Sequence, residues 1–312
     1  MTADLPDRDA LPDLATFGAV LLDLDGVITP TADLHRRAWS AVFTGFFADR
    51  GVAPYTEQDY FDHIDGRPRS EGVAAVLASR GITLPTDRSD PAWSAAGGES
   101  GQGTEDVGVS GVAGDAGVAG DAGDTAGDAT VLGLGLLKNM DFLALLDRGI
   151  DAYPGSVALL DALDALADLD TGAGGPQVAV VSSSRNARPV LAAAGLIDRF
   201  PVIVDGNVAA ERGLPGKPAP DTYRYGAELL GVPEHRAVVV EDAVSGVAAG
   251  AAGDFGLVLG VDRGAGARAL TDAGADIVVA DLGELVDVLG TDSDGGAGGD
   301  GDVTVSDGPA VR

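Results

Sequence analysis

Acidic and hydroxyl side chains follow several short apolar segments of this chain of 312 residues, where they could act together. Five of them stand just after such segments: Asp23, Asp25, Ser182, Glu241 and Asp242. Carboxylates that converge from separate segments would repel one another unless a hard cation lay among them, and oxygen ligands of this kind suit Mg²⁺. Lys217, in a Gly/Pro-rich loop, and the Ser182 hydroxyl would complement phosphate oxygens. The pattern favours Mg²⁺-assisted phosphoryl transfer with an aspartate as nucleophile.

The apolar segments predict the scaffold that positions these groups. They are apolar at every position, which is typical of strands in a parallel sheet covered on both faces. The predicted strands are Ala19–Leu22, Val178–Val181, Ala237–Val240, Leu257–Leu259 and Ile277–Val279. Helical patterns lie between them at Ser156–Asp170, Arg188–Ala194, Asp221–Leu230 and Ala243–Ala252. This alternation predicts an α/β fold with a doubly wound parallel sheet, which binds ligands at the carboxyl ends of its strands.

A helical unit is predicted directly after the first strand. Its helical stretches are Asp33–Phe47, Arg69–Arg80 and Leu136–Arg148. Between them, residues 97–129 are rich in Gly, Ala and Asp, and we expect this low-complexity insertion to be disordered because it buries too little side chain. The predicted organisation is a flexible N-terminus (1–16), an α/β core (17–31 and 150–287), a helical cap (32–149) and a disordered acidic tail (288–312).

The composition limits the partners that the chain could bind. A net charge of −29 disfavours nucleic acids and anionic membrane surfaces. The absence of cysteine excludes disulfides, thiolate nucleophiles and cysteine-ligated metals. The first residues lack the features of a signal peptide, and no apolar run approaches the ~18 residues of a membrane span, so we expect a cytoplasmic protein. Self-repulsion of so acidic a surface favours a monomer.

Four motifs occur in the order found in the haloacid dehalogenase superfamily, which the chain resembles. They are Asp23–Thr29, Ser182, Lys217 and Glu241–Asp242. Further runs are similar to the β-phosphoglucomutase family within that superfamily: Thr31–Trp39, Asp65–Arg69, Lys138–Asn139, Tyr153–Gly155, Ser182–Asn186 and Gly216–Asp221. The resemblance covers roughly residues 17–285 apart from the low-complexity insertion. It implies a Rossmann-like core with a helical cap, Mg²⁺ as cofactor, a small sugar phosphate as substrate and an aspartyl-phosphate intermediate.

The resemblance also implies a role for each matching residue. Asp23 is the implied nucleophile and Asp25 the general acid and base. The implied metal ligands are Asp23, the main-chain carbonyl of Asp25, Glu241 and Asp242. The implied substrate-binding residues are His35, Trp39, Gly66, Arg69, Lys138, Ser182, Ser183, Ser184, Arg185, Asn186 and Lys217. Among these, Ser182 and Lys217 would hold the transferring phosphate, whereas Arg69 and the run Ser184–Asn186 would hold a second one.

Structural interpretations of some of these residues stay open. The hydroxyls of Ser182–Ser184 could cap a helix, and Glu241–Asp242 could be the charges of a helix N-terminus. His35 and Trp39 could pack in a core. The two lysines of the chain are harder to explain in this way, because a sequence with so little lysine keeps both of them at motif positions.

The sequence is compatible with three functions. The first is a mutase that interconverts β-glucose 1-phosphate and glucose 6-phosphate through a bisphosphate, favoured by Arg69 and Arg185 as a grip on a second phosphate. The second is a phosphatase on the same scaffold, in which water takes the phosphate from Asp23. The third is a non-catalytic acidic binding module, which only the low-complexity acidic residues support. Pro30, where many relatives have aspartate in the hinge, would stiffen the approach of the cap.

Overall fold

Six parallel strands form one sheet at the centre of the fold. The computed structural model describes residues 11–64, 69–87, 129–168 and 175–289. In these residues the strand order is β3-β2-β1-β4-β5-β6. The strands are β1 (Ala19–Leu22), β2 (Gln177–Val181), β3 (Val202–Val204), β4 (Ala237–Glu241), β5 (Leu257–Val261) and β6 (Ile277–Val279). The predicted α/β class and doubly wound sheet are confirmed, and only β3 was not among the predicted strands.

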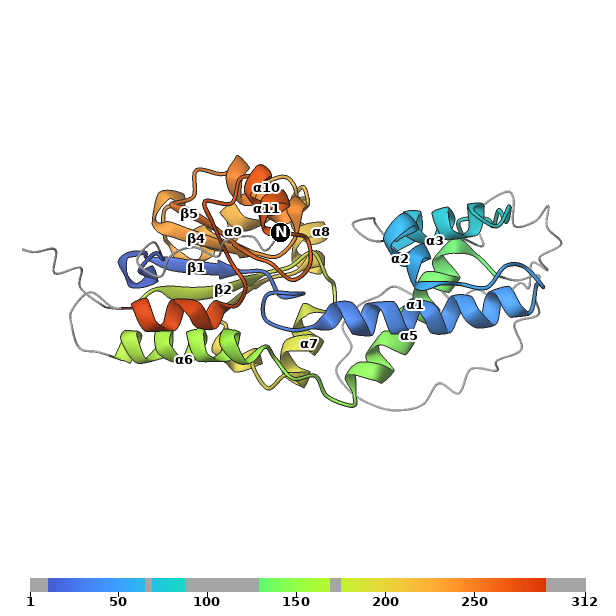
Figure 1. The fold of residues 1–312 in the computed structure, drawn as a ribbon, viewed down its shortest axis with the longest axis horizontal. Coiled ribbons are helices and arrows are strands. Elements are labelled where there is room, and N and C mark those ends of the chain that lie inside the picture. The colour runs from blue at the N-terminus through green and yellow to red at the C-terminus, as the bar shows by residue number, and fades with distance from the viewer. Residues whose placement is uncertain (1–10, 65–68, 88–128, 169–174, 290–312) are drawn as a thin grey trace, which may run out of the picture.

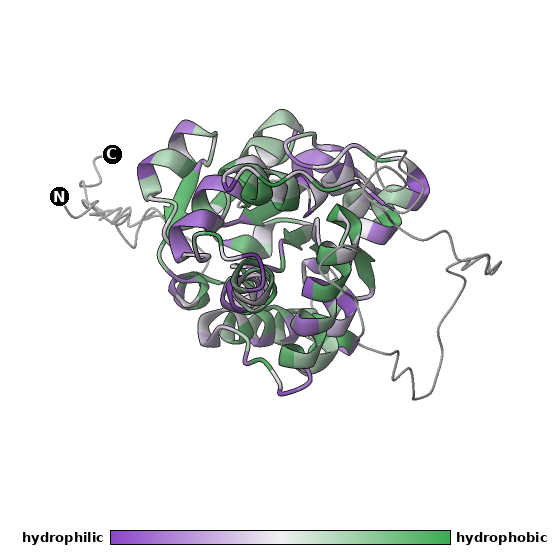
Figure 2. Ribbon diagram, turned by 90° about the vertical axis from the view of Figure 1, so that its right-hand side faces the viewer, coloured by the Kyte–Doolittle hydropathy of each residue, from purple (hydrophilic) through white to green (hydrophobic). Residues whose placement is uncertain are grey.

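Helices cover both faces of the sheet (Figure 1). One face carries α6 (Pro154–Asp168), α7 (Ala187–Ala193) and the 3₁₀ helix η5 (Leu282–Val288), and the other carries α9 (Asp221–Leu230) and α10 (Val244–Ala252). Along β1, Val20 and Leu22 pack on the first face and Ala19 and Leu21 on the second, as the pleat requires. Figure 2 shows the strands coloured as hydrophobic, with hydrophilic segments on the surrounding helices.

The remaining elements of the core are shorter. They are α8 (Gly206–Arg212), α11 (Ala267–Asp272), and the 3₁₀ helices η2 (Leu14–Thr16), η3 (Ile197–Arg199) and η4 (Glu234–Arg236). Residues 11–16 differ from the predicted flexible N-terminus, because Leu14 is fully buried in the core and the Asp13 side chain caps η2. At the other end, η5 extends to Val288, one residue beyond the predicted core.

Helices between β1 and β2 form a cap with its own hydrophobic core (Figure 1). Its described helices are α1 (Thr31–Ala48), α2 (Glu57–His63), α3 (Arg69–Ala78) and α5 (Val131–Leu146). Helix α2 was not predicted; a capping box of Thr56 and Asp59 marks its start. Most of the low-complexity insertion, Gly66, residues 1–10 and the tail from 290 lie outside the described residues.

The register of the sheet places the motif residues at one edge. Leu22, the last residue of β1, pairs with Val180 of β2 and with Val240 of β4. The residues that follow these three positions therefore leave the sheet at the same level, which brings the predicted catalytic groups together. Within the part of the chain that the structure describes, no helix has the length and apolar character that a membrane crossing needs.

Candidate active site

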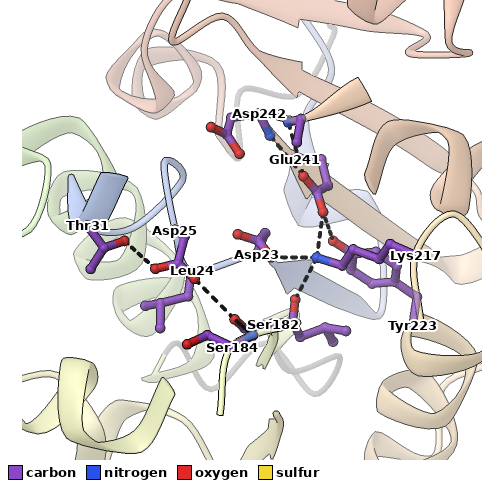
Figure 3. A network of polar contacts seen from close by, with 12 residues as sticks. Asp23, Leu24, Asp25, Thr31, Ser182, Ser184, Lys217, Tyr223, Glu241 and Asp242 are labelled. Carbon is purple, nitrogen blue, oxygen red and sulfur yellow. Dashed lines mark hydrogen bonds and ion pairs between the residues drawn. The ribbon is translucent and has the colours of Figure 1, made fainter. Parts of the chain in front are cut away.

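Lys217 lies between two carboxylates at the carboxyl edge of the sheet (Figure 3). Its Nζ is 2.5 Å from Asp23 Oδ1 and 2.6 Å from Glu241 Oε1, and it donates to the Val181 carbonyl oxygen at 3.1 Å. Burial raises the pKa of Asp23, and the nearby ammonium opposes that rise. Burial alone would lower the pKa of Lys217, but Asp23 and Glu241 raise it above its ordinary value. Lys217 is therefore a charged lysine that holds two motifs together.

Glu241 is fixed by donors on both of its carboxylate oxygens. Oε1 accepts from the Tyr223 hydroxyl at 2.9 Å as well as from Lys217. Oε2 accepts from the backbone N–H groups of Asp242 at 3.1 Å and Ala243 at 3.2 Å. The side chain is only 1% exposed. Glu241 therefore orients Lys217 and the segment that leads into α10, besides adding negative charge to the site.

Asp25 is held by two hydroxyls on the side of the site that faces the cap. The Thr31 hydroxyl donates to Asp25 Oδ1, and Ser182 Oγ donates to Asp25 Oδ2 over 3.4 Å. The Ser182 hydroxyl oxygen in turn accepts from the backbone N–H of Ser184 at 3.0 Å. Burial raises the pKa of Asp25, which favours a protonated carboxyl that can act as an acid.

Three carboxylates form a candidate metal site. Oxygens of Asp23, Glu241 and Asp242 lie within 4.8 Å of one another. Burial raises the pKa of Asp242 to about 7, and the charge of Glu241 adds to the rise. Lys217 pairs with Asp23 and Glu241, and no salt bridge from the described residues reaches Asp242. The three carboxylates share one ammonium and therefore carry excess negative charge. An all-oxygen donor set with excess negative charge fits a hard divalent cation such as Mg²⁺.

Gly26 lets the Asp23–Thr29 motif lie close to the Glu241–Asp242 motif. Its φ is +91°, a conformation that side chains rarely adopt. A Cβ at this position would lie 1.9 Å from Asp242 Oδ2. Glycine is therefore required at position 26 for the Asp25–Gly26 segment to lie against the Asp242 carboxylate.

A buried lysine faces the site from the cap. Lys138 is 2% exposed, and its Nζ contacts His35 Nδ1. The His35 ring stacks on Phe142 with centroids 4.4 Å apart, and Trp39 lies 5.4 Å from Lys138 Nζ. Burial and the Arg69 charge lower the pKa of Lys138 to about 7, and burial lowers that of His35 to about 3. Trp39 is 4% exposed within the cap core, which favours its structural interpretation.

Asn139 joins the cap to the core. Its Oδ1 accepts from Arg69 Nη2 at 3.2 Å and from Asn186 Nδ2 at 2.9 Å. Burial lowers the pKa of Arg69, and the charge of Arg185 adds to that effect. Cations on both sides of the boundary between cap and core, Arg69 and Arg185, could bind an anion there.

The structure thus brings together most residues that the sequence singled out. Ser183 and Arg185 are exposed, Ser184 is half-buried, and Asn186 is buried beside them. The contacts of Thr31, Asn139 and Tyr223 with the site were not predicted. Thr31 and Asn139 lie in runs that carry the family resemblance, whereas no pattern in the sequence marks Tyr223.

Comparison with known proteins shows which family the chain is similar to. A family model described as "haloacid dehalogenase-like hydrolase" matches residues 17–254. The chain is 41% identical over 280 residues to a β-phosphoglucomutase of Mycobacterium bovis, covering 86% of this chain and 91% of that protein. It is also 43% identical over 105 residues to hexitol phosphatase A of Escherichia coli, covering 34% of this chain and 44% of that protein.

A solved structure shares the fold. The crystal structure of β-phosphoglucomutase from Clostridium difficile aligns with a TM-score of 0.57 and 20% identity, covering 86% of this chain and 93% of that one. The cap inserted between β1 and β2 and the acidic cluster at the sheet edge agree with the family match. The chain belongs to the haloacid dehalogenase-like hydrolase family.

Proposed function

We propose that this enzyme is a β-phosphoglucomutase, which converts β-glucose 1-phosphate to glucose 6-phosphate. The observation that carries the proposal is that basic side chains lie at two separate places, each of which would bind a phosphate. Lys217 contacts Asp23 and Ser182 contacts Asp25, whereas Arg69 binds Asn139, which also binds Asn186 next to Arg185. A bisphosphate needs a grip at each end, whereas hydrolysis of a monophosphate needs one. The identity with the mycobacterial β-phosphoglucomutase supports the same proposal.

In the proposed first step, an Asp23 carboxylate oxygen attacks the phosphorus of a glucose bisphosphate. The bond between phosphorus and the sugar oxygen breaks, and Asp25 gives its proton to that oxygen. Lys217 stabilises the charge on the phosphate oxygens. Burial raises the pKa of Asp25 although the hydrogen bonds from Thr31 and Ser182 lower it, and the raised pKa suits a carboxyl that is protonated before the step.

When the 1-phosphate is transferred in the first step, glucose 6-phosphate leaves. In the second step, the 6-hydroxyl of an incoming β-glucose 1-phosphate attacks the phosphoaspartate, which re-forms the bisphosphate for the next cycle. Asp25 takes the proton of that hydroxyl, and the phosphate passes from Asp23 to the sugar, so atoms and protons balance over the cycle. Arg69 and Arg185 hold the phosphate that is not transferred. Closure of the cap keeps water away, which favours transfer to sugar over hydrolysis.

The metal site would serve the same chemistry. Asp23, Asp242 and the main-chain carbonyl of Asp25 would hold Mg²⁺, with Glu241 as a further carboxylate of the group. When bound, Mg²⁺ supplies positive charge that offsets the crowded carboxylates and the phosphate oxygens. No membrane or nucleic-acid partner is required by this function, and the proposed substrate is a small sugar phosphate.

The second candidate is a sugar-phosphate phosphatase, which the match to hexitol phosphatase A favours. In that reaction water takes the phosphate from Asp23, with Asp25 as base. The decisive experiment incubates the protein with Mg²⁺, β-glucose 1-phosphate and a trace of glucose 1,6-bisphosphate. Glucose 6-phosphate without release of phosphate is the expected result, and phosphate with free glucose would establish the phosphatase. An Asp23→Asn sample serves as the control for contaminating enzymes.

A further inference from the structure

Arg263 joins three segments of the core behind the candidate active site. It follows β5, and its Nε donates to the Gly26 carbonyl oxygen at 3.1 Å. Its Nη1 donates to the Ala280 carbonyl oxygen at 3.2 Å, and its Nη2 to Asp281 Oδ2 at 3.1 Å. The guanidinium also lies 3.9 Å from the centroid of the Tyr153 ring. Each nitrogen therefore has a partner, and the planar face of the group has one as well.

The segments that Arg263 joins carry both connections to the cap. Gly26 precedes the connection into α1, and Tyr153 ends the connection from α5 to α6. The two connections also bind each other, because the Tyr153 N–H donates to the Ile28 carbonyl oxygen at 2.9 Å. The Ser156 hydroxyl donates to the Val27 carbonyl oxygen at 2.6 Å. Arg263 thus fixes the core side of both hinge connections to the ends of β5 and β6.

The hydrogen bond from Arg263 to the Gly26 carbonyl oxygen lies next to the candidate metal site. The Gly26 carbonyl that Arg263 binds is one peptide unit from the Asp25 carbonyl, which is a proposed Mg²⁺ ligand. Gly26 also lies against the Asp242 carboxylate without room for a side chain. A shift of the Gly26 peptide would therefore change the separation between the Asp25 carbonyl and Asp242.

We propose that Arg263 is a positioning residue that holds the Asp25–Gly26 segment at the distance from Asp242 that Mg²⁺ binding requires. The proposal rests on the proposed function only through the metal site, and not on the identity of the sugar. Lysine at this position keeps the charge, but it cannot bind three acceptors in a plane and stack on Tyr153 at the same time.

The test compares Arg263→Ala and Arg263→Lys with the unaltered protein and with Arg224→Ala as the control. Arg224 lies on α9, where its Nε pairs with Glu234 over 3.3 Å. Calorimetric titration with MgCl₂ measures the Kd for Mg²⁺ without turnover, and hydrolysis of p-nitrophenyl phosphate gives kcat. We expect Arg263→Ala to raise the Kd for Mg²⁺ and lower kcat by about 10-fold each, because groups that orient metal ligands typically contribute ~10–100-fold. Arg263→Lys should give a smaller change of the same sign, and Arg224→Ala none.

The outcomes separate positioning from a general effect on stability. Millimolar guanidinium chloride should restore part of the Mg²⁺ affinity of Arg263→Ala and leave Arg224→Ala unchanged. A lower Tm with unaltered Kd and kcat in both Arg263 variants would overturn the proposal. If Arg263→Ala does not fold, Arg263→Lys decides by the same Kd measurement. An unaltered protein that binds Mg²⁺ but forms no glucose 6-phosphate from β-glucose 1-phosphate would contradict the proposed function, and the Kd values would still test Arg263.

Discussion

The Nζ atom of Lys217 lies 2.5 Å from Asp23 Oδ1, so the proposed nucleophile and a phosphate-binding lysine form a buried ion pair. Glu241 shares the same ammonium at 2.6 Å. The ammonium opposes the burial that raises the pKa of Asp23, but that pKa stays well above its ordinary value. One lysine thus ties two strand ends together and, in the proposed function, lies beside the position of the incoming phosphate.

Replacement of Lys217 by Met should therefore lower both activity and stability. We expect kcat to fall by about 10²–10³-fold, the usual effect of losing one electrostatic donor at a reacting centre. The free energy of unfolding should fall by roughly 3–5 kcal/mol, because Asp23 and Glu241 would stay buried without their cation. Steady-state kinetics and urea unfolding measure the two effects. Unfolding at the same urea concentration as the unaltered protein would contradict the ion pair.

Asp23→Asn should separate catalysis from folding. The amide has the shape of the carboxylate but cannot form a phosphoaspartate, so we expect kcat to fall by about 10⁴-fold or more. The Tm should change little, because the neutral side chain also relieves the repulsion from Glu241 and Asp242. Residual turnover at a tenth of the original rate would exclude Asp23 as the nucleophile.

The parts of the fold that the sequence predicted are those with a local signal. Strand β1 is apolar at every residue, and β4 is apolar at every residue before Glu241, because both strands are buried on both faces; these runs are visible without a structure. β3 has only Val202–Val204, which is too short to stand out from the apolar residues around it. The α2 helix begins with a capping box, but it is too short to show the hydrophobic periodicity from which a helix is predicted.

The same distinction applies to the site. Asp23, Lys217 and Glu241 could be predicted because each belongs to a motif with a recognisable neighbourhood. Arg263 reaches Gly26 across 237 residues of sequence, and the contact exists only because β5 and the first motif meet at one edge of the sheet. The Tyr223 hydroxyl is likewise brought to Glu241 by the packing of α9 on the sheet, which no local spacing predicts.

Lys138→Met should stabilise the protein near neutral pH while impairing function. The pKa of Lys138 is lowered to about 7 from an ordinary value of 10.5. The folded state therefore binds fewer protons than the unfolded state between about pH 7 and 10.5, and stability should rise with pH across that range. The methionine variant should lack this rise and gain up to about 4 kcal/mol at pH 7. Urea unfolding at pH 6, 7, 8 and 9 measures both, and parallel pH profiles for the two proteins would refute the assignment.

Asp59 and Arg80 should make the cap sensitive to acid. Arg80 Nη1 lies 2.5 Å from Asp59 Oδ1, and both side chains are buried. The hydrogen bond from Arg80 lowers the pKa of Asp59 to about 2 from an ordinary 3.8. The pair therefore stabilises the fold above about pH 4, and this contribution is lost as the pH falls towards 2. Asp59→Asn should lower the free energy of unfolding by about 1–2 kcal/mol at pH 7. The difference between the variant and the unaltered protein should nearly disappear at pH 2, as measured by urea unfolding.

Arg69→Ala should distinguish the two proposed grips for phosphate. Arg69 binds Asn139 Oδ1, away from the Asp23 carboxylate, so its loss should weaken the hold on the phosphate that is not transferred. We expect the KM for the bisphosphate to rise and mutase kcat/KM to fall by about 10²-fold, since a charge-assisted bond contributes ~1.5–3 kcal/mol. Hydrolysis of p-nitrophenyl phosphate, which has no second phosphate, should change less than threefold. Arg50→Ala, at the end of α1 remote from the core, is the matched control because its guanidinium lies on Phe46 within the cap. Equal losses on both substrates would show that Arg69 supports the fold of the site and does not recognise a second phosphate.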